Sequence, residues 1–310
     1  MRAFLFPGQG SQAVGMGVAL AEASRAARDV FGEVDEALGQ GLFKLMRDGP
    51  EDQLKLTENA QPAIMANAIA TLRVLEREFG FELDEEASFV AGHSLGEYSA
   101  LCAAGALDLA TTARLLKLRG QAMQSAVPVG IGAMAALGVD WDDAVAVAAE
   151  AAQGEVCAAA NDNAPGQVVI SGHRGAVERA IEILKGRGVR RAMLLPVSAP
   201  FHCALMRPAA LAMQKALDDA DMASPVCPVF ANVTAAPVSN TAEIKRLLVA
   251  QVTGVVRWRE TVAAMMAAGV THFVEIGGKV LTGMVRKIAP EAQATSLVSI
   301  DDIAAFREQI

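Results

Sequence analysis

The chain has 310 residues, of which 53% are hydrophobic and 20% are charged. This length and composition predict a folded, enzyme-like globule with a sizeable core, and they exclude an intrinsically disordered chain. The 27 basic and 35 acidic residues give a net charge of −8, which gives no support to binding of nucleic acid or of an anionic membrane.

The cysteines indicate a reduced protein without a metal centre. Cys102, Cys157, Cys203 and Cys227 are scattered along the chain without a C-x-x-C pair, so we expect neither a zinc site nor a disulfide framework. No apolar stretch approaches the length of a membrane span, and the N-terminus lacks a full signal-peptide core. A cytoplasmic protein is the simplest interpretation.

The first hundred residues are predicted to alternate between strands and helices. We expect a strand over residues 3–6, a glycine-rich loop over 8–12, and a helix over 63–79 with Pro62 in its first turn. The loop lacks the P-loop pattern and the full dinucleotide-binding pattern, so the residues alone favour an ordinary strand-to-helix turn over a phosphate site.

Gly92-His93-Ser94-Leu95-Gly96 lies between a short apolar run, 89–91, and a helix-like segment that continues to Gly105. Strand, Gly-x-Ser-x-Gly and helix in this order predict a nucleophile elbow with Ser94 at its tip. The two glycines remove Cβ atoms where the strand and the helix crowd together. The amide of Leu95, at the start of the helix, then points to where an oxyanion would form.

A helix over 111–126 follows, and residues 128–132 form a candidate boundary. Beyond it we expect a strand (133–139), a helix (140–152), a strand (156–160), a turn (161–166), a strand (167–171), a helix (175–185) and a strand (191–197). This β-α-β-β-α-β order is the ferredoxin-like arrangement. Further strands over 226–233, 271–276 and 296–300 alternate with helices, which favours a mainly parallel sheet. We therefore predict a large α/β domain from residues 1–130 and 198–310, with a small ferredoxin-like domain, 131–197, inserted into it.

A serine nucleophile needs a base, and the chain has four histidines. His93 neighbours Ser94 on a tight bend, so its side chain should point away from the serine. We expect His173 in an exposed turn and His272 in a strand as a structural residue. His202 follows a strand end and opens a helix, a junction that often carries catalytic groups. The residues alone leave a base and a capping or packing role about equally open for His202.

Six segments resemble the malonyl-CoA:acyl-carrier-protein transacylase family. They are Phe-Pro-Gly-Gln-Gly-Ser-Gln (6–12), Glu-Asn-Ala-Gln-Pro-Ala (58–63), Gly-His-Ser-Leu-Gly-Glu-Tyr-Ser-Ala-Leu (92–101), Leu-Arg-Gly-Gln-Ala-Met-Gln (118–124), Asn-Ala-Pro-Gly-Gln-Val-Val-Ile-Ser-Gly (163–172) and the segment around His202 (197–206). The segments occur in the family's order over nearly the whole chain. The resemblance implies a hydrolase-like α/β core with a ferredoxin-like insert, in agreement with the elements predicted above.

The resemblance also implies a reaction. Ser94 would take malonyl from malonyl-CoA with His202 as general base, and would pass it to the phosphopantetheine thiol of a holo acyl carrier protein, supplying fatty acid synthesis. The backbone amides of Gln9 and Leu95 would bind the oxyanion, and the main-chain carbonyl of Gln251 would orient the histidine. We expect a monomer with coenzyme A thioester as substrate and with no permanently bound cofactor and no metal.

Specificity is expected from two residues. By resemblance, Arg119 binds the free carboxylate of malonyl, which its planar guanidinium can hold with two parallel hydrogen bonds. Phe201 should crowd the carbon between the two malonyl carbonyls and so disfavour methylmalonyl.

We expect the acidic carrier protein to dock on a basic patch formed by Lys185, Arg187, Arg190 and Arg191, although a solvated charged turn is an equally good interpretation. One departure concerns Gly277-Gly278, between which related chains commonly have an extra residue. This loop therefore looks one residue shorter, which leaves its effect on substrate entry open.

Two other classes of function compete with acyl transfer. A serine esterase or thioesterase would use the same elbow, but would need a triad acid and would have no use for Arg119. A binding or scaffold protein with a dead site is disfavoured, because Ser94, His202, Arg119 and Gln9 are all present. The same transfer could also serve polyketide synthesis or malonate decarboxylation.

Overall fold

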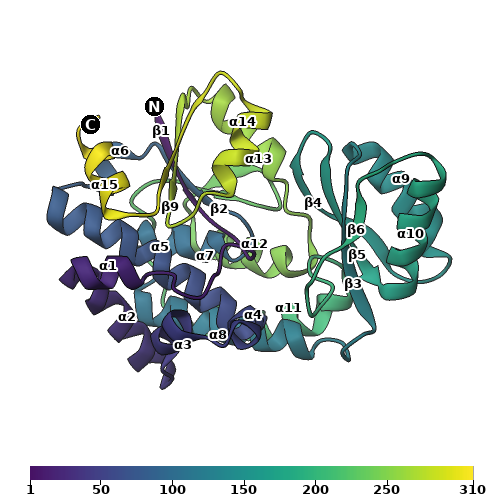
Figure 1. Cartoon of the computed structure of the whole chain (residues 1–310), viewed down its shortest axis with the longest axis horizontal. Coiled ribbons are helices and arrows are strands. Elements are labelled where there is room, and N and C mark those ends of the chain that lie inside the picture. The colour runs from purple at the N-terminus through teal and green to yellow at the C-terminus, as the bar shows by residue number, and fades with distance from the viewer. Residues whose placement is uncertain (310) are drawn as a thin grey trace.

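The computed structural model describes residues 1–309, which form a large lobe from both ends of the chain and a small lobe from its middle (Figure 1). The large lobe contains a six-stranded sheet in the order β10-β9-β1-β2-β7-β8. Its strands are β1 (Arg2–Phe6), β2 (Phe89–Gly92), β7 (Val229–Ala231), β8 (Ala236–Val238), β9 (His272–Ile276) and β10 (Gln293–Leu297).

Every neighbouring pair in this sheet is parallel except β7 and β8. The predicted mainly parallel sheet is therefore confirmed. Its central strand β1 is almost wholly buried, as expected for a parallel strand that is covered on both faces.

Helices cover the sheet on both sides. Those before the small lobe are α1 (Val18–Ala23), α2 (Arg25–Leu38), α3 (Leu42–Asp48), α4 (Glu51–Lys55), α5 (Thr57–Phe79), α6 (Leu83–Glu86), α7 (Gly96–Ala103) and α8 (Leu109–Ser125). Those after it are the 3₁₀ turn η1 (Ala204–Met206) and the helices α11 (Arg207–Asp219), α12 (Thr241–Thr253), α13 (Trp258–Ala267), α14 (Leu281–Ile288) and α15 (Ile300–Arg307).

The small lobe contains an antiparallel sheet in the order β4-β5-β3-β6. Its strands are β3 (Gly132–Leu137), β4 (Cys157–Ala164), β5 (Gln167–His173) and β6 (Ala192–Leu194). Its two helices, α9 (Trp141–Ala152) and α10 (Arg174–Gly186), lie on the side of the sheet away from the large lobe (Figure 1). This β-α-β-β-α-β arrangement confirms the predicted ferredoxin-like fold of the insert.

Several details of the predicted elements were wrong. The strand expected over 296–300 is β10 (Gln293–Leu297), and Ile300 already begins α15. Pro62 does not open a helix, because α5 already begins at Thr57 and Pro62 lies inside it. Residues 161–164 are not a turn but the end of β4. His173 is not in an exposed turn: it ends β5, is partly buried, and its Nδ1 accepts a hydrogen bond from the amide of Val156.

The end of β4 joins the small lobe to the large one. Asn161 forms a parallel bridge with Val256, and the amide of Asp162 donates to the carbonyl of Val256 at 2.9 Å. The buried carboxylate of Asp162 accepts two further bonds from the Arg259 side chain. The polar stretch that had predicted a turn is therefore a strand end at the contact between the lobes, where Asp162 and Asn163 find side-chain partners on the large lobe.

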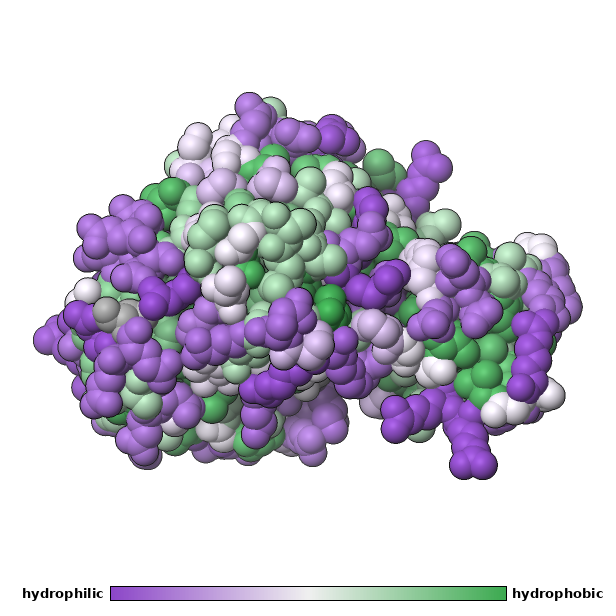
Figure 2. All heavy atoms as spheres, turned by 90° about the horizontal axis from the view of Figure 1, so that it is seen from above, coloured by the Kyte–Doolittle hydropathy of each residue, from purple (hydrophilic) through white to green (hydrophobic). Residues whose placement is uncertain are grey.

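The space-filling view shows the molecule narrowing between the two lobes, with hydrophobic side chains gathered on the small lobe among hydrophilic ones (Figure 2). Within residues 1–309, the helices are either too short or too polar to cross a membrane.

Candidate active site

Ser94 lies at the sharp bend between β2 and α7, with a left-handed backbone φ of 54°. The bend requires both flanking glycines. A Cβ on Gly92 would lie 1.8 Å from the backbone of Gly96, and one on Gly96 would lie 2.2 Å from the carbonyl oxygen of Phe6. A non-glycine residue with positive φ is uncommon, and such residues cluster at functional sites. The predicted elbow geometry is thus present around Ser94.

His202 approaches Ser94 from the loop before η1, and its own φ of 59° is also left-handed. Its Nε2 lies 2.8 Å from Ser94 Oγ, and its Nδ1 lies 2.9 Å from the main-chain carbonyl oxygen of Gln251. A carbonyl can only accept, so Nδ1 carries the proton and the lone pair of Nε2 faces the serine hydroxyl. A neutral imidazole in this tautomer can remove the serine proton.

Arg119, on α8, completes the group with its guanidinium, and the residue is 1% exposed. Its Nη2 donates to Ser94 Oγ at 3.2 Å and to the side-chain oxygen of Gln251 at 2.8 Å, while Nη1 donates to Gln61 Oε1 at 2.8 Å. No carboxylate among the described residues forms an ion pair with it. A buried cation without an ion-pair partner is costly, so this position suits an anionic ligand.

These side chains line a cavity of about 390 Å³ between the lobes. Gln9, Leu95 and Phe201 also line it, and the small lobe contributes Met134 and Val169. The loop 8–12 comes close to the elbow, since a Cβ on Gly8 would lie 2.7 Å from the carbonyl oxygen of His93. The glycine at this position therefore lets the backbone beside Gln9 approach the reacting group.

The segment that follows the shortened loop also borders the cavity, through Val280 and through Leu281 and Met284 of α14. Its shape is held by the buried Glu275, which accepts from the amides of Val280 and Thr282 at 3.0 and 2.8 Å. This side of the cavity is therefore apolar, and the hydrogen bonds of Glu275 hold its backbone in place.

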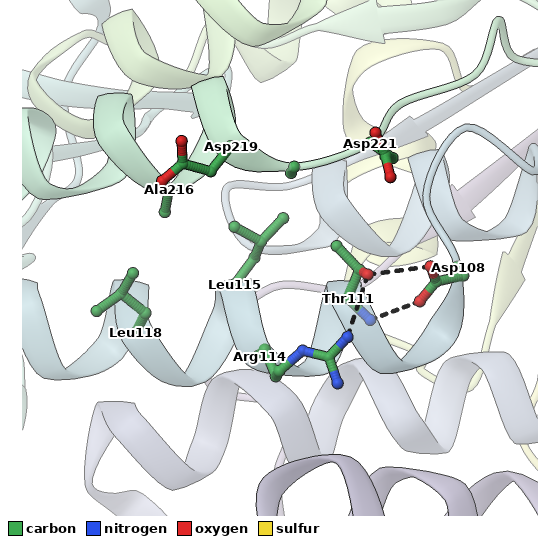
Figure 3. A pocket seen from close by; sticks show the side chains of 9 residues that line it. Asp108, Thr111, Arg114, Leu115, Leu118, Ala216, Asp219 and Asp221 are labelled. Atoms are coloured by element: carbon green, nitrogen blue, oxygen red, sulfur yellow. Dashed lines mark hydrogen bonds between the residues drawn. The ribbon is translucent and has the colours of Figure 1, made fainter.

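A second cavity, of about 340 Å³, lies between α8 and α11 (Figure 3). Its wall contains Asp108, which caps α8 by accepting from the amide of Thr111 at 2.6 Å, and Arg114, which donates to the same threonine's hydroxyl. Asp108, Thr111 and Arg114 are thus engaged at the start of α8, and none of the site residues predicted from the sequence lies in this wall.

Three polar residues around Ser94 and Arg119 were not singled out from the sequence. Asn232 Oδ1 accepts from the Ser94 amide at 2.7 Å, and Asn232 Nδ2 donates to the carbonyl of Gly92 at 2.7 Å. Gln61 accepts from Arg119, and Glu97 is buried beside Asn232. Gln61 and Glu97 lie within two of the segments that resemble the family. Asn232 lies outside them, directly after β7. Its place at the carboxyl end of a parallel strand, where functional groups gather, is the signal that could have identified it.

The other histidines have separate roles. His93 points away from Ser94, and its Nε2 lies 2.7 Å from Asn163 Oδ1. His272 is in β9 and its Nε2 contacts the hydroxyl of Thr295 at 2.9 Å.

The basic patch predicted to bind a carrier protein is partly neutralised by acidic neighbours. Lys185 pairs with Glu182 at 2.8 Å, and Arg187 pairs with Glu150. Arg190 and Arg191 are exposed, and neither forms an ion pair with an acidic residue that the structure describes. The local positive charge available to a partner therefore comes mainly from these two arginines.

Comparison with known proteins agrees with this geometry. The model of a family described as "Acyl transferase domain" matches residues 3–294. The chain belongs to the acyl transferase domain family. A malonyl CoA-acyl carrier protein transacylase of Escherichia coli K12 is 44% identical over 99% of this chain and 98% of its own length. The protein of the same name from Bacillus subtilis 168 is 46% identical over 92% of this chain and 90% of its own length.

Solved structures of acyl transferases give the same result. The acyl-carrier-protein-S-malonyltransferase of Bartonella henselae superimposes with a TM-score of 0.97 at 51% identity, covering 99% of this chain and 98% of the other. A malonyl-transacylase solved in complex with a type II PKS acyl-carrier protein gives 0.96 at 40% identity, over 100% and 99%. The chain is therefore an acyltransferase with the hydrolase-like core and ferredoxin-like insert of this family.

The pH dependence of acylation should reflect the buried histidine of this acyltransferase. Burial, and then the charge of Arg119, lowers the pKa of His202 to about 3. The histidine is thus unprotonated, and competent as a base, well below its ordinary value of 6.5. We expect the acid limb of kcat/KM for serine acylation to lie well below pH 6.5, measured by rapid quench between about pH 4 and 8.

Glu97 supplies the control for this profile. Burial raises the pKa of the Glu97 carboxyl to about 7. Any inflection near pH 7 that comes from this carboxyl should therefore be absent from the variant Glu97→Gln. An acid limb at pH 6.5 that persists in Glu97→Gln would contradict the low pKa of His202.

Proposed function

We propose that this acyltransferase moves malonyl from malonyl-CoA to the phosphopantetheine thiol of an acyl carrier protein through a malonyl ester of Ser94. The observation that carries the proposal is the buried guanidinium of Arg119, whose Nη2 lies 3.2 Å from Ser94 Oγ. A cation at this distance from the nucleophile fits an acyl group that ends in a carboxylate. The names of the relatives from Escherichia coli and Bacillus subtilis support the same substrate pair.

Acylation follows from the tautomer of His202. Nε2 takes the Ser94 proton as Oγ bonds to the thioester carbon, and the oxyanion that forms is bound by the backbone amides of Gln9 and Leu95. The C–S bond then breaks, and the imidazolium returns the proton to the sulfur of coenzyme A. The Gln251 carbonyl keeps the ring oriented and stabilises the imidazolium.

Transfer to the carrier protein repeats these steps in reverse order. His202 removes the proton of the phosphopantetheine thiol, whose sulfur attacks the ester carbon of malonyl-Ser94. The C–Oγ bond breaks and His202 returns the proton to Ser94, which restores the enzyme. The residues need no bound cofactor and no metal for either half-reaction. We propose fatty acid synthesis as the pathway, with polyketide synthesis and malonate decarboxylation as alternatives.

A transfer assay tests the proposal against hydrolysis. The enzyme is mixed with malonyl-CoA and holo acyl carrier protein, and malonyl-carrier protein and free malonate are quantified by mass spectrometry. We expect malonyl-carrier protein to form much faster than malonate. Faster release of malonate would instead indicate a hydrolase. The structure speaks against a hydrolase triad, because His202 Nδ1 donates to a carbonyl oxygen and not to a carboxylate.

Phe201 is proposed to restrict the size of the acyl group. It is 8% exposed and lines the cavity directly before His202, so a methyl branch on the malonyl unit would contact its ring. We expect Phe201→Ala to raise the turnover of methylmalonyl-CoA relative to malonyl-CoA by about tenfold, with Phe201→Leu as a milder control. Equal turnover of the two thioesters by the wild type would contradict this role.

The carrier protein is proposed to dock on the basic patch, with Arg190 and Arg191 as its main contributors. Reversing both charges (Arg190→Glu with Arg191→Glu) should raise the KM for carrier protein about tenfold and leave the KM for malonyl-CoA unchanged, because only the acidic partner contacts the patch. Arg25→Glu, an exposed residue on α2, is the matched control. If the KM for carrier protein is unchanged in the double variant, the patch is not the docking site.

We propose that the large domain comprises residues 1–130 and 198–310 and that the small domain comprises 131–197. We further propose that the enzyme works as a cytoplasmic monomer.

A further inference from the structure

Glu97 is a buried carboxylate that the reaction described above does not use. It lies in the first turn of α7, three residues after Ser94, and is 2% exposed. Its Oε2 accepts two hydrogen bonds, one from the amide of Asn232 at 3.0 Å and one from Gln251 Nε2 at 2.8 Å. A buried carboxylate with such defined partners needs a reason to be there.

The contact with Gln251 fixes which end of that amide faces the substrate cavity. Gln251 Nε2 donates to Glu97 and also to the Ser94 carbonyl at 3.0 Å, which leaves Oε1 to accept from Arg119 Nη2 at 2.8 Å. If the amide were reversed, its NH₂ group would face the guanidinium and its oxygen would face the carboxylate. A carboxyl oxygen of Glu97 can accept from Nε2 whether the group is ionised or protonated, whereas an NH₂ group turned toward the guanidinium would place two donors against each other.

Arg119 depends on that orientation. Its guanidinium is held on one side by Gln61 Oε1 and on the other by Gln251 Oε1. Without Gln251 Oε1, Arg119 Nη2 would lose a buried acceptor, and the guanidinium would rotate away from its position beside Ser94. A carboxylate that binds with two parallel bonds is sensitive to such a rotation.

We propose that Glu97 is a positioning residue that fixes the side-chain amide of Gln251 and thereby holds Arg119 ready for the carboxylate of the acyl group. Glu97 is then a determinant of selectivity for acyl groups that end in a carboxylate. The inference rests on the proposed malonyl transfer. A merely structural role, in which Glu97 supports the elbow through Asn232, would instead slow all acyl donors equally.

The test compares acylation of Ser94 by malonyl-CoA and by acetyl-CoA, followed in a single turnover by intact-mass analysis. In Glu97→Met, which has similar size and no hydrogen-bonding oxygen, we expect the ratio of malonyl to acetyl kcat/KM to fall about tenfold or more. In Glu97→Gln, whose amide oxygen can still accept from Gln251, the ratio should stay within about threefold of wild type. Ser99→Ala removes another buried polar group from α7, one that has no hydrogen-bond partner, and should leave the ratio unchanged.

Glu97→Asp keeps the test valid if Glu97→Met does not fold. The shorter side chain withdraws the acceptor from Gln251, so its ratio should lie between those of wild type and Glu97→Met. An unchanged ratio in Glu97→Asp or Glu97→Met, or an equal loss of both activities, overturns the positioning role. If the wild type itself shows no preference for malonyl, the proposed function fails instead, and this inference fails with it.

Discussion

Replacing Ser94 with alanine is expected to abolish the covalent intermediate. Incubation of the wild type with malonyl-CoA should add one malonyl unit to the intact mass, and Ser94→Ala should show no addition. Transfer to carrier protein should fall by roughly 10⁴-fold or more, because no other group replaces the nucleophile. Only Ser94 Oγ lies within hydrogen-bond distance of both His202 Nε2 and Arg119 Nη2 among the described contacts.

Two further measurements show whether the loss of acylation in Ser94→Ala comes from the missing hydroxyl and not from misfolding. Ser94→Ala should unfold at nearly the same temperature as the wild type, since the substitution keeps the Cβ at this left-handed position and removes only the hydroxyl. Peptide mapping of the labelled wild type should place the malonyl group on the peptide that contains the elbow. Retained acylation in Ser94→Ala, or a label on one of the four cysteines, would remove the basis for the mechanism.

Removing the guanidinium of Arg119 should change which acyl group is accepted rather than whether acylation occurs. In Arg119→Ala we expect the kcat/KM for malonyl-CoA to fall roughly a hundredfold or more, because the substrate carboxylate would be buried without its cation. Acylation by acetyl-CoA, which brings no charge into the cavity, should change far less. The measurement is the ratio of the two rates, determined by intact mass on the same enzyme preparations.

Two variants control for this result. Arg119→Lys keeps the charge but loses the planar fork, so it should recover only part of the malonyl activity. Lys117→Ala removes another cation from the same helix, one that pairs with Glu58 at 3.2 Å and is not part of the cavity wall. Equal losses of malonyl and acetyl activity in Arg119→Ala would show that the arginine acts on the catalytic geometry and not on the carboxylate.

The fold could be predicted largely because its signals are local. The apolar run of β2, the two glycines and the following helix are consecutive in the chain, so the elbow is encoded by adjacent residues. The ferredoxin-like order could be read from the alternation of elements in the same way. The extent of β4 could not, because Asn161, Asp162 and Asn163 look like turn residues until the large lobe supplies their partners.

The site could be predicted only where chemistry limits the choice. His202 was one of four histidines, and the resemblance rather than any local pattern assigned it as the base. Gln251 was named for its carbonyl, yet its side chain also contacts Arg119, Glu97 and Ser94. Such contacts join residues more than a hundred positions apart in the chain, so no local pattern reveals them.

The strand β4 couples the thermal unfolding of the two lobes. Its last residues form backbone bonds to Val256, and the carboxylate of Asp162, which is buried, has its cationic partner Arg259 on the other lobe. Melting of either lobe alone would leave that carboxylate and those amides without partners, which makes a half-unfolded chain costly. The insert, although it has a hydrophobic core of its own, should therefore melt together with the rest of the chain in one cooperative transition.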